Sequence, residues 1–568
     1  MSFIFRISLA VLVLCSLCGF AQPVVNSALN AASYVTPPPD SITKAANPAP
    51  IAQGSIFVVF GTGLSGDGLV QASAFPLTGT LNNTSIAVSS GGQTSNALMV
   101  YTLPTQLAAI LPSNTAAGTA TLTVTYNGQT SKSINIVVTK AVPGIFTFNS
   151  QGFGPGIAQV AFSGTDIRLN NLTTPATPGS VMILYGTGLG PISGGDSTPP
   201  GAVSTGGTVT VTVGGKAATV LYAGRTPQFP GEDQINIQLP ADVPLGCYTP
   251  AVVAVNGIPS NDFTLSTASA TGSCVHPFGL STATEAQVDA GGTANVGVFA
   301  AIRGAVPPIT ADGAGGLFEN ANAVQLYTTY SEILASFRVI SYPTPTGSCV
   351  VYDGLYIPTG LSIPDFSTIG STELKSQPIL IILTGPDGTV TKIPASTAGY
   401  LDVNLIGPNS PPILGPGTFT LSGTDGPDIA AFKATTQFPE NLVWSNSGNL
   451  LSPPRTAVTI AWTGGGTGNQ NLNIFGNASV FNVADPSQNR GKWFSCLVPA
   501  AGSSPFQIPP AVTAQLPVPQ GSNEIGEGTL GIATGGGAQF NATLTNGKNL
   551  DGSMFGFGEA FVNTVTWK

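Results

Sequence analysis

An internal duplication constrains the fold of this chain more than any other feature. The segment GSIFVVFGTGL at residues 54–64 recurs as GSVMILYGTGL at residues 179–189. Further along the chain, QLAAILP at residues 106–112 is matched by QINIQLP at residues 234–240. The offset between matched positions stays between 125 and 129 residues, so the first half of the chain holds two copies of one domain.

Each copy is predicted to consist of short strands joined by tight turns. Residues 119–126 alternate between polar and apolar side chains, and Asn127-Gly128 follows them as a typical two-residue hairpin turn. Asn256-Gly257 occupies the same place in the second copy. Strands at this spacing, in copies of about 100 to 120 residues, predict an immunoglobulin-like sandwich for each copy.

The repeated residues resemble a known domain family. The opening strand that ends in Gly-Thr-Gly-Leu and the later Asn-Gly hairpin are similar to an IPT/TIG domain, which has an Ig-like fold. In the second copy, LYGTGLG at residues 184–190, LYAG at residues 221–224 and residues 234–240 resemble a repeated module of secreted, mostly uncharacterised acidobacterial proteins. The match covers roughly residues 27–269. It implies an Ig-like fold and an extracellular setting, and it carries no catalytic residues.

One motif inside the repeat matches a nucleotide-binding signature. Residues 61–66 read GTGLSG, a GxGxxG pattern that binds dinucleotides only where a helix follows it. Asp67, Gly68 and then Pro76 follow here, without helical periodicity. The motif is therefore predicted to be a glycine turn between strands.

Length and composition place the repeat within a larger all-β chain. A chain of 568 residues exceeds what one hydrophobic core supports. Charged residues make up only 8%, and there are 71 Gly and 47 Pro, which favours sheets and tight turns over exposed helices. The predicted fold class is all-β: tandem Ig-like (IPT/TIG-like) sandwiches at residues 22–141 and 142–269, followed by one or two further β-sandwich domains. We divide the second half into a β-rich domain at residues 270–395 and a C-terminal β-sandwich domain at residues 396–568.

The first residues predict export. Residues 1–21 combine Arg6, an apolar run over residues 7–20 and the small residues Gly19 and Ala21 at the two positions that a signal peptidase reads, which is the layout of a cleaved signal peptide. A retained membrane anchor is the alternative, but the run is shorter than the roughly 20 residues that span a bilayer. The chain is therefore predicted to be secreted or displayed at the cell surface.

Four cysteines remain after the signal peptide, at positions 247, 274, 349 and 496. An even count in an exported chain predicts two disulfides, and three pairings are open. We favour Cys247–Cys274, which is local, and Cys349–Cys496, which then lies within the C-terminal half. Metal ligation is the rival interpretation, but it has few further ligands to draw on because the chain has one histidine.

No recognisable catalytic motif stands out. His276 is the only histidine, so any Ser-His-Asp mechanism would have to use it, and its position beside Cys274 favours a structural role. Pairs of carboxylates could hydrolyse a glycosidic bond without histidine. The acids considered, most of them in Gly/Pro turns, are Glu232, Asp233, Asp353, Asp365, Asp425, Asp428, Glu440 and Glu559.

Two binding alternatives remain open. Asp-Gly turns such as those at Asp67, Asp387, Asp425 and Asp551 suit a structural calcium ion, although no DxDxDG loop occurs. All four tryptophans fall in the last quarter of the chain. Trp444 and Trp493 are candidates for stacking on sugar rings, against the alternative that they pack in a core.

The sequence as a whole predicts a non-catalytic protein that needs no cofactor. Its function would be adhesion, matrix assembly or protein contact, with an extracellular protein or a polysaccharide as partner. A carbohydrate-binding protein that uses the C-terminal aromatic residues is the alternative, and a glycoside hydrolase is a distant one. Nucleic acid is excluded as a partner because the net charge is −9 and no run of Lys or Arg occurs. No stretch after the signal predicts a membrane span.

Overall fold

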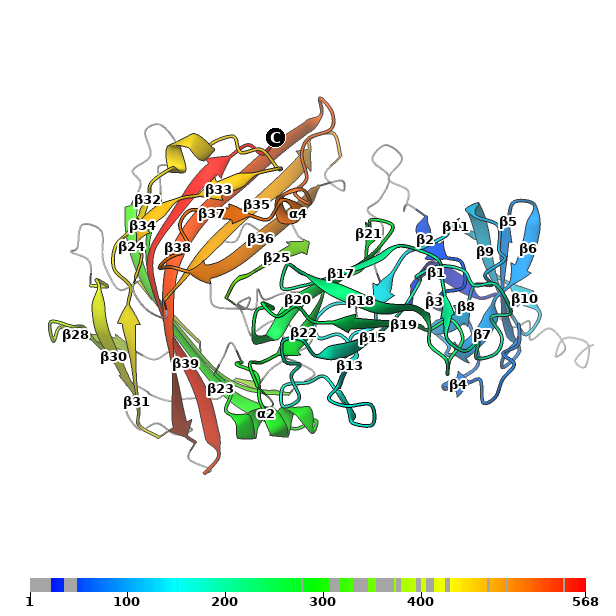
Figure 1. Ribbon diagram of the computed structural model, residues 1–568, viewed down its shortest axis with the longest axis horizontal. Helices are drawn as coiled ribbons and strands as arrows, with labels where there is room; N and C mark the ends of the chain where they lie inside the picture. Colours follow the sequence, from blue (N-terminus) through cyan, green and yellow to red (C-terminus); the bar gives the residue numbers. More distant parts are fainter. Residues whose placement is uncertain are drawn as a thin grey trace, which may run out of the picture.

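The computed structural model is almost entirely β-sheet (Figure 1). It describes residues 22–34, 48–150, 152–270, 272–276, 279–306, 316–329, 346–353, 372–373, 380–394, 400–404, 413–423, 430–466, 470–485, 489–544 and 547–568. The predicted signal peptide at residues 1–21 lies outside these ranges, as does the predicted boundary at residue 395. Among the described residues, no helix is long and apolar enough to cross a membrane.

The first repeat folds into the predicted two-layer sandwich. One layer has the strand order β1 (Val24–Asn30), β3 (Ile56–Thr62), β8 (Gln106–Ile110), β7 (Leu98–Thr102) and β4 (Val70–Gln71). The other has β2 (Ala49–Ala52), β11 (Ile134–Thr139), β9 (Gly118–Tyr126), β5 (Thr84–Ser90) and β6 (Gln93–Asn96), with β10 (Gln129–Thr130) paired to β9. The core between them is built from inward-facing side chains such as Phe57, Leu107 and Leu122.

The Gly-Thr-Gly-Leu motif is a turn at the end of a strand, as predicted. β3 ends at Thr62, Gly63 takes a left-handed φ of 63°, and the next element is the strand β4. Gly61 pairs with Val25 of β1, and a Cβ atom at Gly61 would overlap the backbone carbonyl of Val24. The motif therefore has a packing role, because it lets a neighbouring strand approach closely.

The second repeat forms another sandwich, in which one strand belongs to both layers. The strands follow the order β14 (Ile167–Leu169), β13 (Ala158–Ala161), β15 (Val181–Thr187), β19 (Asp233–Gln238), β18 (Lys216–Arg225), β17 (Val209–Val213), β20 (Gly246–Val255) and β21 (Ile258–Pro259). β12 (Gly144–Ile145), β16 (Val203–Ser204) and β22 (Phe263–Thr267) pair at its margins. β18 pairs with β17 at one end and with β19 at the other, past a bulge between Val220 and Tyr222. The Asn-Gly hairpins of both repeats are confirmed, since Asn127 and Asn256 adopt positive φ angles of 46° and 51°.

The second half of the chain is organised around one nine-stranded sheet. Its order is β25 (Ser348–Asp353), β36 (Arg490–Pro499), β35 (Asn471–Asn482), β38 (Glu524–Thr543), β39 (Asn549–Val565), β23 (Thr293–Val306), β24 (Gly316–Thr329) and β26 (Thr372–Glu373), with β29 (Tyr400–Asn404) on β24. β25 and β23 precede residue 395 and pair with β36 and β39, which follow it. Strands from both predicted C-terminal domains therefore share one sheet. Local patterns cannot show such pairing, because the partners are far apart in the sequence.

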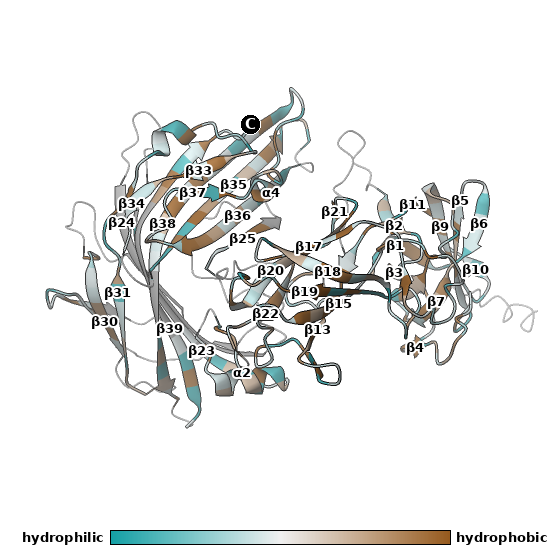
Figure 2. Ribbon diagram, in the orientation of Figure 1, coloured by the Kyte–Doolittle hydropathy of each residue, from teal (hydrophilic) through white to brown (hydrophobic). Residues whose placement is uncertain are grey.

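Smaller sheets cover this large sheet (Figure 1). One has the order β28 (Val390–Pro394), β27 (Leu380–Thr384), β30 (Gly417–Gly423) and β31 (Phe432–Phe438), and Phe432 stacks on Phe540 of β38 at 5.0 Å between ring centroids. Two further strand pairs pack on the large sheet and share a hydrophobic core with β35, β36 and β38. They are β32 (Leu442–Trp444) with β34 (Trp462–Gly464), and β33 (Val458–Ile460) with β37 (Phe506–Ile508). Hydrophobic and hydrophilic residues are mixed along these strands (Figure 2), and β31 alternates strictly between buried and exposed positions. Within the described ranges, the helical elements are α2 (Thr282–Asp289), η3 (Ser447–Leu450) and α4 (Pro510–Thr513).

Candidate functional site

The two Ig-like domains meet across a packed face. The outer side of the β1–β3–β8–β7–β4 sheet buries Leu29, Ile56, Val58, Ala108 and Ile110, and Phe146 and Phe229 of the second domain pack against this cluster. Phe75 of the first domain meets Phe229 edge-on, with 5.8 Å between ring centroids. β3 is therefore buried on both sides, which explains its unbroken apolar run.

A buried ion pair lies at this junction. Arg225 at the end of β18 and Asp233 at the start of β19 are register partners, and both side chains are 0% exposed. The guanidinium of Arg225 bonds Asp233 and also donates Nη2–H bonds to the backbone oxygens of Gly54 (2.6 Å) and Gly190 (2.9 Å). Since Gly54 belongs to the first domain, this one side chain links both repeats.

The surroundings of Asp233 shift its pKa in opposite directions. Burial raises the pKa of Asp233, and the Arg225 guanidinium and the backbone N–H of Leu189, at 2.7 Å from Oδ2, oppose that rise. A buried ion pair is tolerated only when such additional bonds satisfy it, and removing one partner is strongly destabilising. The pair therefore ties the two domains together.

Further polar bonds cross the same junction. The Asp196 carboxylate of the second domain accepts bonds from the backbone N–H (2.7 Å) and the hydroxyl (2.8 Å) of Ser113 in the first. The Thr187 hydroxyl accepts a bond from the backbone N–H of Ile56 at 2.8 Å and donates one to Gly231 O at 2.7 Å. These contacts fix the relative orientation of the repeats.

A second junction joins the repeats to the C-terminal sheets through α2. The Asp289 carboxylate, at the end of the helix, accepts bonds from the Thr173 backbone N–H (2.8 Å) and hydroxyl (2.7 Å) in the second domain. Ser281, which caps the start of the helix, donates to the Asp551 carboxylate of β39 at 2.8 Å from its backbone N–H. The short helix thus contacts both neighbours through polar bonds.

Both predicted disulfides are confirmed. Cys247–Cys274 ties β20 to the segment that leads into α2. Cys349–Cys496 joins directly opposed residues of β25 and β36. The second bridge therefore fastens a strand that precedes residue 395 to one that follows it.

His276 and Glu285 lie close to the first disulfide. His276 is buried, its Nε2 lies 2.9 Å from the Tyr248 hydroxyl, and burial lowers its pKa to about 3. The imidazole is therefore neutral near pH 7 and bonds to a phenol. Burial is also the main reason that the pKa of Glu285 rises to about 7, and the nearby Asp289 and Asp551 add to the shift.

The predicted sugar-stacking tryptophans are both buried, so neither offers an exposed ring. Trp444 is 5% exposed and opposes Trp462 across the β32–β34 pair, with its indole N–H bonded to Asn446 at 3.0 Å. Trp493 is 9% exposed on β36. Trp567 is buried in the same core as Trp444. The prediction was wrong for these residues because large rings gain more from core packing than from solvent contact.

Two of the predicted acidic sites are engaged within the chain. Asp387 accepts a bond from the backbone N–H of Thr389 at 2.9 Å, and Asp551 holds Ser281. Cys247, Cys274 and Glu285 form a group at metal-ligand spacing, but the disulfide leaves no thiolate to bind an ion. Asp425 lies outside the described residues.

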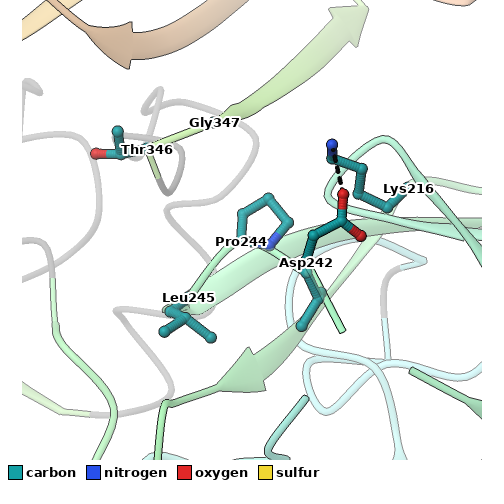
Figure 3. A pocket seen from close by; sticks show the side chains of 7 residues that line it. Lys216, Asp242, Pro244, Leu245, Thr346 and Gly347 are labelled. Atoms are coloured by element: carbon teal, nitrogen blue, oxygen red, sulfur yellow. Dashed lines mark ion pairs between the residues drawn. The ribbon is translucent and has the colours of Figure 1, made fainter. Parts of the chain in front are cut away.

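A cleft of about 420 Å³ lies beside the second domain, where β18 and residues 242–245 face Thr346 and Gly347 (Figure 3). Lys216 and Asp242 form an ion pair across 2.9 Å, and their side chains are 44% and 68% exposed. The bond to Lys216 lowers the pKa of Asp242. Such an exposed pair contributes little energy, and its charges neutralise each other. The cleft therefore has room for a small ligand, but its one ion pair gives it no reactive group.

Sequence patterns did not reveal the interdomain site. They give no role to Arg225, and they present Asp233 only as one of several acids that could form a hydrolytic pair. One feature of the sequence could have indicated this site: Arg225 ends an apolar strand in a chain that has only 17 Lys and Arg residues. Its pairing with Asp233 follows from the β18–β19 register.

The fold and junctions define a protein built from tandem Ig-like β-sandwiches and a larger C-terminal β-unit. The chain matches no protein-family model and no curated protein. Among solved structures, it is similar to SGBP-B from a xyloglucan utilization locus in Bacteroides uniformis, with 8% identity over 96% of this chain and 100% of that one and a TM-score of 0.16. It is also similar to titin Ig tandem domains (11% identity, 36% and 83% coverage, TM-score 0.11) and to domains 5–6 of the S-layer protein SbsC (12% identity, 44% and 100% coverage, TM-score 0.15). These likenesses concern the fold alone.

Proposed function

We propose that this chain is a non-catalytic secreted or surface protein that works in adhesion, matrix assembly or protein contact. The observation that carries this proposal is the buried Arg225–Asp233 pair, whose guanidinium also bonds Gly54 of the first domain. Domains within one chain move relative to each other unless their interface is extensive and apolar. Here an apolar cluster and buried polar bonds hold the repeats, so their loops and sheet faces are presented at fixed positions.

The compartment and the partner follow from the same features. Two disulfides indicate an oxidising compartment, which fits a secreted or surface protein. The partner is an extracellular protein or polysaccharide, and export through a cleaved signal peptide belongs to this proposal. No cofactor is required for it. The relationship to IPT/TIG domains and to secreted acidobacterial proteins, suggested by the repeat motif, is likewise proposed.

Binding without turnover is the test of this function. The mature chain, residues 22–568, is incubated with immobilised extracellular proteins and polysaccharides. Retained protein and newly formed reducing ends or amino termini are measured over time. We expect saturable retention and no time-dependent cleavage. Product that accumulates in proportion to protein and time would establish a hydrolase, and absence of retention by every polymer would reject the binding role.

A further inference from the structure

The outer face of the β14–β13–β15–β19–β18 sheet carries an ordered array of polar side chains. One row crosses all five strands in register: Leu169, Gln159, Ile183, Asn236 and Tyr222. Tyr185 and Gln234 oppose each other in the neighbouring row. At about 4.8 Å between strands, the longer row spans about 19 Å, which is long enough for a short oligosaccharide.

Hydrogen bonds fix the polar groups of this array. The Tyr185 hydroxyl donates to Gln159 Oε1 at 2.7 Å, and Gln234 Nε2 donates to Asn236 Oδ1 at 2.9 Å. Each bond uses only part of an amide, since a carboxamide carries two N–H donors and an oxygen acceptor. The N–H groups of Gln159 and Asn236 and the oxygen of Gln234 are left to face a ligand. All four side chains are half-buried, so they are held in place rather than fully solvated.

The first repeat shows what the same face does when it is apolar. Tyr101 opposes Ala108 beside a bulge, just as Tyr222 opposes Asn236 beside a bulge, so Ala108 and Asn236 are equivalent positions. By the same register, Leu29 corresponds to Gln159. In the first repeat these positions are buried under the second domain. In the second repeat the equivalent positions hold the amide side chains of Gln159 and Asn236.

Charge on this face narrows the class of ligand. Neither row contains a charged residue, and Arg168 of β14 is bonded to Asp166. Glu232, next to the array, has its pKa raised to about 7 by burial and by Asp233. A surface of amides, phenols and a few aliphatic groups complements a ligand that has hydroxyls and apolar faces but no net charge.

We propose that this face binds a neutral polysaccharide. The rings of Tyr185 and Tyr222 lie against the apolar faces of sugar rings, and Gln159, Gln234 and Asn236 exchange hydrogen bonds with their hydroxyls. The inference rests on the proposed binding role, to which it adds a ligand class and a surface. It places sugar contact in the second Ig-like domain, away from the C-terminal tryptophans.

The test is affinity electrophoresis of the mature chain through gels that contain hydroxyethyl cellulose, galactomannan or dextran, with polygalacturonate as a charged comparison. We expect at least one neutral polymer to retard the protein. Asn236→Ala and Tyr185→Ala should each weaken this retardation about tenfold, which corresponds to about 1.4 kcal/mol. Tyr185→Phe keeps the aromatic ring but removes the hydroxyl bonded to Gln159, so it should weaken retardation less than Tyr185→Ala does. The matched control is Thr210→Ala with Thr212→Ala, two exposed positions on β17 in the opposite layer.

The outcomes separate this inference from the proposed function. Thermal unfolding of each variant confirms that it is folded. Retardation that persists in Asn236→Ala and in Tyr185→Ala would overturn this face as the site, while leaving a binding function elsewhere on the chain. Free migration of the wild-type chain through every neutral gel would overturn the ligand class. Binding to extracellular proteins alone would then support the proposed function without this inference.

Discussion

Removal of the Arg225 guanidinium should loosen both Ig-like domains at once. Arg225→Met leaves the Asp233 carboxylate buried without its counter-ion and breaks the bonds to Gly54 and Gly190. Breaking one side of a buried ion pair costs about 3–5 kcal/mol. Because one of the lost bonds crosses the junction, we expect strands of the first domain to be affected together with those of the second.

Hydrogen exchange read by mass spectrometry is the suitable assay. All four tryptophans lie in the C-terminal half, so intrinsic tryptophan fluorescence would report on a different part of the molecule. Exchange resolves β3 and β8 of the first domain from β18 and β19 of the second. The free energy of opening should fall in all four strands in Arg225→Met, by about 3–5 kcal/mol where the opening breaks the junction.

Two further variants make the argument refutable. Arg168→Met removes an arginine of the same domain from an exposed pair with Asp166, and it should leave exchange unchanged. Arg225→Met combined with Asp233→Asn removes the buried charge and keeps an oxygen for the Leu189 N–H, so it should recover more than half of the loss. Equal effects of Arg225→Met and Arg168→Met, or a double variant no better than the single one, would refute the reasoning.

Three other expectations can be measured by urea denaturation. Replacing Cys349 and Cys496 by Ala should cost about 5 kcal/mol and replacing Cys247 and Cys274 about 3.5 kcal/mol, because the Cys349–Cys496 bridge closes the longer loop. The reverse order would contradict the chain-entropy argument. The pKa of Glu285 is raised to about 7, so the folded state holds this proton more tightly than the unfolded state, and stability should fall by up to about 3 kcal/mol as the pH rises from about 4.5 to 7. Glu285→Gln should flatten that slope, and an unchanged slope would contradict the role of Glu285. Gly61→Ala should destabilise by about 1–3 kcal/mol through overlap with Val24, whereas Gly164→Ala, which meets no atom within 4 Å, should stay within about 0.5 kcal/mol.

Local features of the fold could be predicted from the sequence. The duplicated motif, the Asn-Gly hairpins and the pairing of Cys247 with Cys274 depend on residues that are close in the chain or repeated within it. The parallel pairing of β23 with β39 could not be predicted, because it joins residues 296–302 to residues 551–557 with no signal at either place. The burial of Trp444 was missed for a similar reason, since its neighbours in the core come from distant strands.

The duplication also explains why the two Ig-like domains have different surfaces. Both copies keep the structural elements of the sheet: the close-packed glycine at Gly61 and Gly186, and the tyrosine beside the bulge at Tyr101 and Tyr222. What differs is the outer face, where Ala108 corresponds to Asn236. An apolar face gains stability when another domain covers it, whereas an amide-bearing face loses its hydration when covered and regains it only from a partner with matching polar groups. The first copy therefore uses this face to bind the second copy, and the second copy has the same face open to a polar ligand.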